Sequence, residues 1–296
     1  MDKQEIESYK KAGEIAKKVV AYARGIVKPG VKLLEIAEKI EGKIIEFRGD
    51  IAFPVNLSID EIAAHYTPSP DDETKADGLL SVDIGVAVDG FIADTAFSVD
   101  LTKDKKYKDM IELNEKALES ALKIIKPGVM IKEIGEAISK VVGDKYSVVR
   151  NLSGHSLDKN QIHAGLTISN YQNNNNLELK DIAIAIEPFL TSGRGEIYEG
   201  KDSEIYALQK GGSIRDGDAR KILKFVKEKY DTLPFCRRWL VRAGFKKVDF
   251  CLKVLTQQGI FKNFPVLIEK GRVAVSQAEH SVLITKEQAI IYTKSQ

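Results

Sequence analysis

Apolar residues recur every three to four positions along the start of the chain, which is the pattern of an amphipathic helix. Residues 4–27 show it first, and Lys28-Pro29-Gly30 then ends the helix because proline and glycine interrupt helical backbone. Residues 33–48 repeat the pattern and predict a second helix. Strands are predicted where apolar or alternating runs are bounded by turn residues, at residues 79–88, 91–99, 146–152, 182–189 and 273–285.

Part of this pattern occurs twice. The sequence of Ile26–Val31 reappears almost unchanged at Ile124–Val129, and several of the residues that follow match at the same offset. A repeat this long, present only twice, is not a solenoid. It predicts two structurally similar halves, each with helices laid on strands. His65 and His163 stand at equivalent points of the two halves, which favours a functional site between them.

Composition excludes several classes of protein. The chain has 296 residues, 43% of them hydrophobic, which suffices for a sizeable core. Its 45 basic and 43 acidic residues nearly balance, which argues against a polyanion binder as a whole. The sequence contains neither a long apolar run nor a secretory signal, and Cys236 and Cys251 do not make a disulfide framework. We therefore expect a cytoplasmic protein with reduced thiols.

Residues 201–262 differ from the rest of the chain in charge. They hold 15 Lys and Arg residues against 7 Asp and Glu residues. Residues 220–230 show a helical pattern within this segment. We interpret 201–262 as a mostly helical insertion subdomain, and residues 1–200 together with 263–296 as the domain that receives it.

The most informative stretch is a predicted hairpin. Asp89-Gly90 is typical of a two-residue hairpin turn, and placing the turn there makes Gly85 oppose Asp94. Because side chains alternate between the two faces of a strand, Asp83 and Asp94 then share one face and the apolar residues share the other. The two aspartates become diagonal neighbours, roughly 7–8 Å apart at Cα. A solvated polar face is the plain interpretation, and a site for cations is the alternative.

Three further residues favour the cation site. Glu187 and Glu279 lie in or at the end of very apolar runs, where a carboxylate is costly unless it is paired or bound to metal. His155 follows a short strand and offers a nitrogen ligand. Four carboxylates and one imidazole, with no cysteine, suit two divalent ions such as Mn, Fe or Co and admit Zn. Such a site activates water, which predicts hydrolysis of an amide, an ester or a phosphoester.

These residues follow one another in the order Asp, Asp, His, Glu, Glu, which resembles the pita-bread (creatinase/aminopeptidase) metallopeptidases. Within that family five segments look like methionine aminopeptidase, and the long gap between Glu187 and Glu279 resembles the short, archaeal-like form of the type 2 enzymes. The resemblance implies an α+β pita-bread fold with pseudo-two-fold related halves, and removal of the initiator methionine from nascent proteins. The five segments are Ala63–Pro68, residues 83–100, Asn151–His155, Ile162–Gly165 and Ile186–Phe189.

The resemblance also implies a role for each ligand. Asp83 would bind one of two divalent ions (Co, Mn, Fe or Zn), Asp94 and Glu279 would bridge the pair, and His155 and Glu187 would complete the second site. Glu187 also stands where the family has its candidate general base.

Further residues are implied to bind substrate. His163 would stabilise the oxyanion and His65 would lie near the amide nitrogen of the substrate, and both count as catalytic and substrate-binding residues. Phe53, Ile162 and Phe264 match positions that line the pocket for the methionine side chain. Phe264 departs from the tyrosine expected in eukaryotic relatives, which removes a hydroxyl from the mouth of that pocket.

Two other functions stay open at this point. One is a prolidase or Xaa-Pro aminopeptidase on the same fold, although those relatives typically carry an extra N-terminal domain. The other is a metal-free relative that binds RNA or protein, which the basic segment 201–262 favours and the full ligand set opposes. The expected partners are nascent polypeptide N-termini and, through 201–262, the ribosome. We expect a monomer that does not bind membranes.

Overall fold

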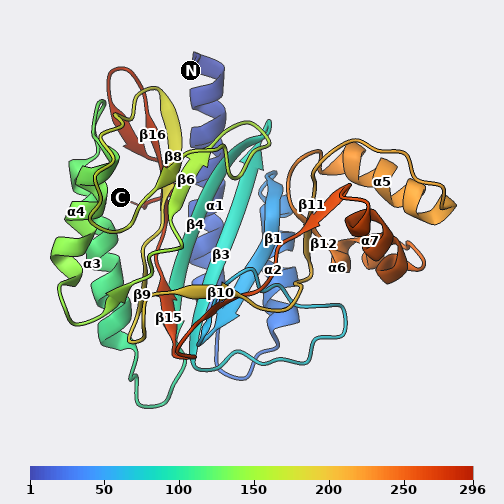
Figure 1. Cartoon of the computed structure of the whole chain (residues 1–296), viewed down its shortest axis with the longest axis horizontal. Helices are drawn as coiled ribbons and strands as arrows, with labels where there is room; N and C mark the ends of the chain where they lie inside the picture. The colour runs from blue at the N-terminus through green and yellow to red at the C-terminus, as the bar shows by residue number, and fades with distance from the viewer. Residues whose placement is uncertain (296) are drawn as a thin grey trace.

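Two helices open the chain, and the computed structural model describes residues 1–295 (Figure 1). Helix α1 (Lys3–Ile26) begins at a capping box, in which the Asp2 side chain accepts hydrogen bonds from the backbone N–H groups of Gln4 and Glu5. Helix α2 is Leu33–Glu46. Both predicted helices are confirmed to within two residues. Among the described residues, no helix combines the length and the apolar character needed to cross a membrane.

The predicted hairpin is confirmed with its register. Strands β3 (Leu79–Val88) and β4 (Phe91–Asp100) pair antiparallel, and Gly85 opposes Asp94 as expected. Strand β1 (Asp50–Ile59) completes a sheet in the order β1-β3-β4. Its apolar face packs against α1 and α2, and α1 lies behind β3 and β4 in Figure 1. The other face is therefore free to present the two aspartates.

The second half repeats this arrangement with its own helix pair and sheet. Helices α3 (Lys108–Ile124) and α4 (Ile131–Val142) cover a five-stranded sheet in the order β17-β16-β8-β6-β7. The turn before α2 and the turn before α4 have the same form, because Gly30 and Gly128 have φ angles of +83° and +84°. The strands are Gly154–Leu157 (β6), Thr167–Ile168 (β7), Ile182–Ile186 (β8), His280–Ile284 (β16) and Ala289–Ile291 (β17).

Three of the predicted strands are interrupted. The run 182–189 stops at Glu187-Pro188 and resumes as β9 (Phe189–Thr191), and the run 273–285 breaks at Ala278-Glu279 between β15 and β16. Only Ser147–Val148 (β5) of 146–152 is strand. At each break the chain passes from one sheet to another, which a continuous apolar run does not reveal. The smaller sheets are β15 (Val275–Gln277)-β9-β5 and β10 (Ile197–Glu199)-β14 (Leu267–Glu269)-β2 (Ile62–Ala64).

Residues 201–262 extend to one side of the molecule in Figure 1 and contain most of a separate hydrophobic cluster. Their helices hold 13, 6 and 10 residues, and a three-stranded sheet in the order β12-β11-β13 accompanies them. The regular structure of the segment is therefore mostly helical, as expected, with a small sheet added to it. The division into domains stays a prediction. The elements are Ile205–Leu208 (β11), Gly217–Lys229 (α5), Phe235–Cys236 (β12), Arg237–Arg242 (α6), Val248–Gln257 (α7) and Phe261–Asn263 (β13).

A buried ion pair joins this segment to the first half. Arg238 of α6 donates a hydrogen bond to Glu41 of α2, and both side chains are at most 3% exposed. Trp239 Nε1 donates to the other oxygen of Glu41 at 2.9 Å, and Arg238 Nη1 donates to the carbonyl oxygen of Pro68 at 3.3 Å. Removing one partner of a buried ion pair is strongly destabilising, because the other charge then stays buried without compensation. The contact therefore depends on both Arg238 and Glu41.

We predict that Arg238→Met lowers the free energy of unfolding by roughly 3–5 kcal/mol, because Glu41 would remain buried without its cation. Urea denaturation of the purified variant measures the change. The matched control is Lys39→Met, which removes the exposed partner of Glu35 on the same helix, at 2.6 Å, and should cost under about 1 kcal/mol. Equal losses in the two variants would contradict the role given to the buried pair.

Candidate metal centre

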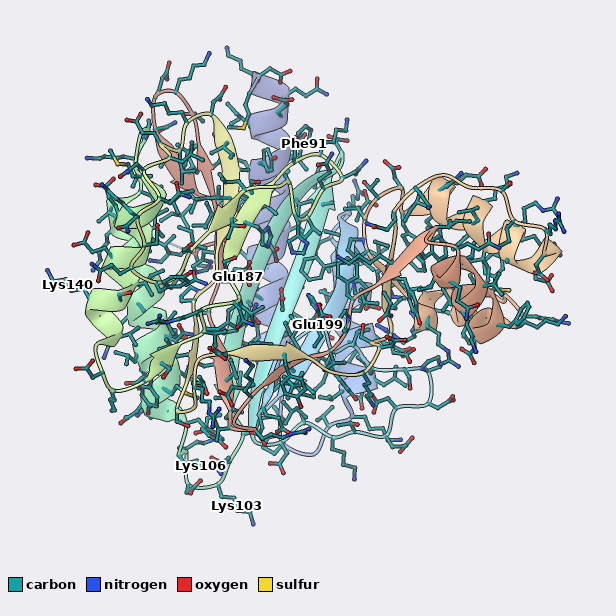
Figure 2. All side chains as sticks on the ribbon, viewed as in Figure 1. Phe91, Lys103, Lys106, Lys140, Glu187 and Glu199 are labelled. Carbon is teal, nitrogen blue, oxygen red and sulfur yellow. The ribbon has the colours of Figure 1, made fainter. Side chains whose placement is uncertain are left out.

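One cavity of about 370 Å³ collects the functional residues expected from the sequence. Its volume lies in the range of small-molecule sites. Figure 2 shows Glu187 in the middle of the molecule, whereas Lys103 and Lys140 lie at its edge. The lining includes all ten residues that the sequence singled out: Phe53, His65, Asp83, Asp94, His155, Ile162, His163, Glu187, Phe264 and Glu279.

The seam between the two large sheets positions two of these carboxylates. The backbone N–H of Asp94 donates to Ser281 Oγ at 2.9 Å, and Ser281 Oγ donates to the carbonyl oxygen of Asp94 at 2.7 Å. Just before β16, the backbone N–H of Glu279 donates to the carbonyl oxygen of Ala96 of β4 at 3.0 Å. Asp94 and Glu279 therefore face each other although they come from opposite ends of the sequence.

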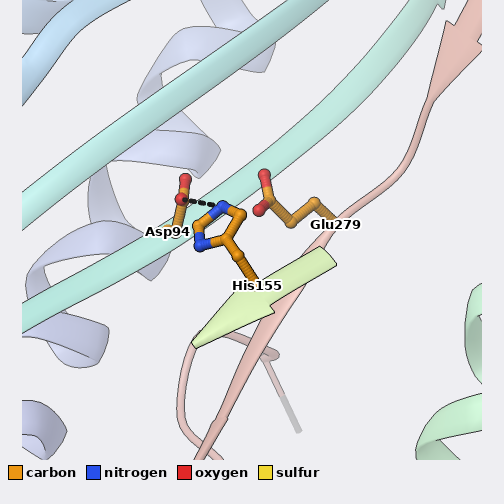
Figure 3. A group of neighbouring side chains, drawn as sticks. All are labelled: Asp94, His155 and Glu279. Atoms are coloured by element: carbon orange, nitrogen blue, oxygen red, sulfur yellow. Dashed lines mark ion pairs between the residues drawn. The ribbon is translucent and has the colours of Figure 1, made fainter. Parts of the chain in front are cut away.

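An imidazole completes a three-residue cluster. Ligand atoms of Asp94, His155 and Glu279 all lie within 4.8 Å of one another, and the three side chains point at one spot in Figure 3. His155 Nε2 lies 3.6 Å from Asp94 Oδ2 and 3.5 Å from Glu187 Oε1. Gly154 permits the approach of β6 to β8, because a Cβ there would come 2.2 Å from the carbonyl oxygen of Ala185.

Asp83 and Glu187 are linked by a residue that the sequence did not single out. Gln277 Nε2 donates to Asp83 Oδ2 at 3.3 Å and to Glu187 Oε2 at 3.5 Å. Gln277 is buried on β15, two residues before Glu279. The sequence did contain a signal for Gln277. Its polar amide interrupts an apolar run, and its spacing of two residues from Glu279 puts both on the same face of a strand.

Burial dominates the electrostatics of the cluster. It raises the pKa of Asp83 to about 7, and burial together with the neighbouring carboxylates raises the pKa values of Asp94, Glu187 and Glu279. Burial lowers the pKa of His155 to about 3, so its imidazole is neutral and can act as a ligand.

The carboxylates also lack partners. Asp83 Oδ1, Asp94 Oδ1 and both carboxylate oxygens of Glu279 are buried and accept no hydrogen bond. The ion pairs of residues 1–295 include no Lys or Arg bound to these groups. Buried carboxylate oxygens without a partner are costly, and a divalent cation satisfies them. The donor set therefore fits a metal centre, in agreement with the chemistry expected from the sequence.

Two histidines stand beside the cluster. His65 Nδ1 lies 3.1 Å from the carbonyl oxygen of Pro265. The backbone of His65 has a φ of +63°, a left-handed conformation that residues other than glycine seldom adopt. The His65 ring packs edge-on against the ring of Phe264, with 5.6 Å between the ring centroids. The ring of His163 packs edge-on against that of His155, with 4.5 Å between the centroids. Burial lowers the pKa of His65 to about 4 and also lowers that of His163. Both imidazoles are neutral hydrogen-bond donors at neutral pH.

An apolar wall adjoins these polar groups. Phe53, Ile162 and Phe264 line the cavity together with Leu267. Gly85 leaves the space that the ring of Phe53 occupies, because a Cβ on Gly85 would lie 2.2 Å from Phe53 Cε1. The small residue noted in the hairpin therefore makes room for an aromatic ring beside the two aspartates.

Comparison with known proteins identifies relatives over almost the whole chain. The sequence matches the model of metallopeptidase family M24 over residues 7–222. It is 41% identical to the methionine aminopeptidase of Pyrococcus abyssi (strain GE5 / Orsay) over 296 residues, which cover 98% of this chain and 100% of that protein. The archaeal-type resemblance drawn from the sequence is confirmed.

Solved structures confirm the pita-bread fold. A thermophilic Arx1 superposes with a TM-score of 0.85 at 16% identity, covering 100% of this chain and 92% of that one. The prolidase of Pyrococcus furiosus gives a TM-score of 0.60 at 19% identity, covering 100% of this chain but 65% of that one. Identities this low show the fold alone.

We predict that Gln277→Leu weakens metal binding by about 10- to 100-fold, because groups that orient metal ligands typically contribute that much. Isothermal titration of the metal-free protein with Mn²⁺ or Co²⁺ measures the affinity. Gln288→Leu, at an exposed position, is the matched control and should leave the affinity unchanged. An unaltered affinity in a folded Gln277→Leu protein would exclude Gln277 from the metal centre.

Proposed function

This chain belongs to metallopeptidase family M24 and is a metal-dependent aminopeptidase that removes the initiator methionine of proteins, and we propose that the cavity holding Asp94, His155 and Glu279 is where it does so. The observation that carries the proposal is a cluster of buried, unpartnered carboxylate oxygens beside an apolar wall. The cluster suits divalent metal, and the wall suits a thioether side chain.

Five side chains would hold two divalent ions. Asp83, Asp94, His155, Glu187 and Glu279 offer oxygen and nitrogen donors that suit Co, Mn, Fe or Zn. When bound, the ions supply Lewis-acid chemistry that activates water and polarises a peptide carbonyl. Asp94 and Glu279 would be shared between the two ions, because the seam between β4 and β16 turns both toward the same point. Asp83 would complete the holding of one ion, and His155 and Glu187 would complete the holding of the other.

The protons move through groups of the protein. Glu187 takes the proton of the attacking water and delivers it to the leaving amine, which is the task of a general base that then acts as a general acid. His163 donates a hydrogen bond to the oxygen that gains negative charge, and His65 contacts the amide nitrogen of the scissile bond.

The apolar wall selects the substrate. Phe53, Ile162 and Phe264 surround the methionine side chain, and His65 and His163 close the same pocket on its polar side. A phenylalanine at 264 offers only packing, where a tyrosine would add a hydroxyl. Burying the thioether side chain excludes water from the scissile bond and positions that bond against the two imidazoles.

The alternatives are less favoured. The relatives named methionine aminopeptidase match at full length, whereas this chain covers 65% of a prolidase of the same fold. A binder that needs no metal does not explain the unpartnered oxygens of Glu279. We further propose that the substrates are nascent polypeptides in the cytoplasm and that the enzyme acts as a monomer.

We predict that Asp94→Asn or Glu279→Gln lowers kcat/KM on a Met-Ala-Ser peptide by more than the ~100-fold typical of losing a residue that only orients a ligand. His65→Asn should cost less than either ligand variant, because His65 contacts the amide nitrogen of the substrate and holds no metal. His280→Asn is the matched control for His65→Asn, because His280 is also partly buried but bonds Thr293 outside the cavity. Near-normal turnover in either ligand variant, or faster cleavage of Xaa-Pro than of Met-Ala peptides, would refute the assignment.

We also propose that residues 201–262 contact ribosomal RNA, because α5 turns its apolar side inward and exposes lysines outward. Lys221→Glu with Lys224→Glu should reduce co-sedimentation with ribosomes and its dependence on salt. The charge-matched control is Lys103→Glu with Lys140→Glu, at exposed positions elsewhere. Co-sedimentation that is absent, or insensitive to salt, would leave the segment as an ordinary solvated surface.

A further inference from the structure

A second cavity of about 350 Å³ adjoins the catalytic one. The two cavities share His65 as a common wall. The remaining lining residues of the second cavity are Tyr66, Thr67, Ser69, Asp71, Asp72, Glu73, Lys201, Asp202, Ser203, Glu204 and Val266.

Three segments run from one cavity into the other. Residues 64–67, 203–205 and 264–266 each line the catalytic cavity at one end and the second cavity at the other end. Three separate pieces of chain therefore border both cavities, and we call the two neighbouring cavities together the trench.

The second cavity is acidic. Its lining holds five carboxylates and one lysine. Asp72 is engaged by the hydroxyl of Tyr66 at 2.6 Å, and Glu73 pairs with Lys32 at 2.7 Å. Asp71 and Asp202 are exposed and form no ion pair with any residue among 1–295.

The remaining carboxylate and the single lysine do not change the sign of the cavity. Glu204 Oε2 lies 3.8 Å from Arg237 Nη1, so Arg237 neutralises the Glu204 carboxylate only weakly. Lys201 balances one carboxylate of the five. The part of the trench beyond His65 therefore attracts cations.

A buried hydroxyl also points to a polar ligand. Thr67 lines the second cavity and is 2% exposed, yet its Oγ1 has no hydrogen-bond partner. A buried hydroxyl without a partner is costly. A peptide backbone passing along the trench supplies both the N–H and the C=O groups that this hydroxyl can bond. The cavity is thus suited to extended polypeptide as well as to positive charge.

We propose that the second cavity binds the substrate from its third residue onward and favours lysine or arginine there. The inference rests on the function proposed above, because that function places the scissile amide beside His65. The chain beyond that bond must leave the catalytic cavity, and the second cavity, which shares His65 with the first, lies beside it to receive that chain. An extended chain advances roughly 3.3 Å per residue, so residues three to five of the substrate lie among Thr67, Asp71 and Asp202.

The test compares amidated peptides that differ only beyond the second residue. Met-Ala-Lys-Lys, Met-Ala-Ser-Ser and Met-Ala-Glu-Glu are assayed with the metal-loaded enzyme. We expect kcat/KM to fall in that order, with about a three- to tenfold advantage of the lysine peptide over the serine peptide, as suits exposed ion pairs. The advantage should shrink as salt is raised, because salt screens exposed charges.

Two variants and a control locate the effect. Asp71→Asn with Asp202→Asn should bring the ratio between the lysine and serine peptides close to one. Asp144→Asn with Glu287→Gln removes two exposed carboxylates outside the trench and should preserve the ratio. Thr67→Val should lower kcat/KM more on Met-Ala-Ser-Ser than on the dipeptide Met-Ala, since only the longer substrate reaches it.

Equal rates on the three peptides, or a preference that survives Asp71→Asn with Asp202→Asn, would overturn the basic-residue subsite while the methionine aminopeptidase function stands. Cleavage of none of the peptides by the metal-loaded enzyme would overturn that function and the subsite with it.

Discussion

The candidate site depends on bringing carboxylates and an imidazole together inside the molecule: ligand atoms of Asp94, His155 and Glu279 lie within 4.8 Å of one another, and Asp83 and Glu187 line the same cavity. Like charges in a low-dielectric interior repel, so the fold must hold them in place and leave them open to a cation. Asp94 and Glu279 are fixed through their own backbones at the seam between two sheets, and their carboxylate oxygens remain without partners. A site built for stability alone would have filled these positions with apolar side chains. A divalent cation would satisfy those oxygens, which gives a physical reason for retaining the cost.

The pseudo-two-fold arrangement explains how distant parts of the sequence reach one site. The first half supplies Asp83 and Asp94 from one hairpin, and the second half supplies its ligands from strand ends. His65 and His163, at equivalent points of the repeat, line the same cavity. Each half keeps its own helix pair against its own sheet, so the seam carries function while the two cores carry stability.

The sequence predicted those parts of the site that depend on short-range backbone geometry. A two-residue turn fixes the register of a hairpin, and so the shared face of Asp83 and Asp94 followed from Asp89-Gly90 alone. The breaks after β8 and β15 were not predictable, because an apolar run looks the same whether its chain stays in one sheet or passes to another. Gln277 was missed although its place in an apolar run, two residues before Glu279, was a usable signal. The small sheet within 201–262 has strands of two to four residues, too short to show an alternating pattern.

The segment 201–262 is coupled to the catalytic trench at both of its ends. Residues 203–205 lead into it and residues 264–266 lead out of it, and both stretches line the two cavities. Arg238 reaches from the same segment to the carbonyl oxygen of Pro68, which directly follows Thr67 in the wall of the acidic cavity. Arg238, which pairs with the buried Glu41, therefore also holds the loop beside the acidic cavity. Under the proposal above, residues 201–262 act on what the enzyme accepts beyond methionine, because residues 203–205 and 264–266 line both cavities at the two ends of this segment.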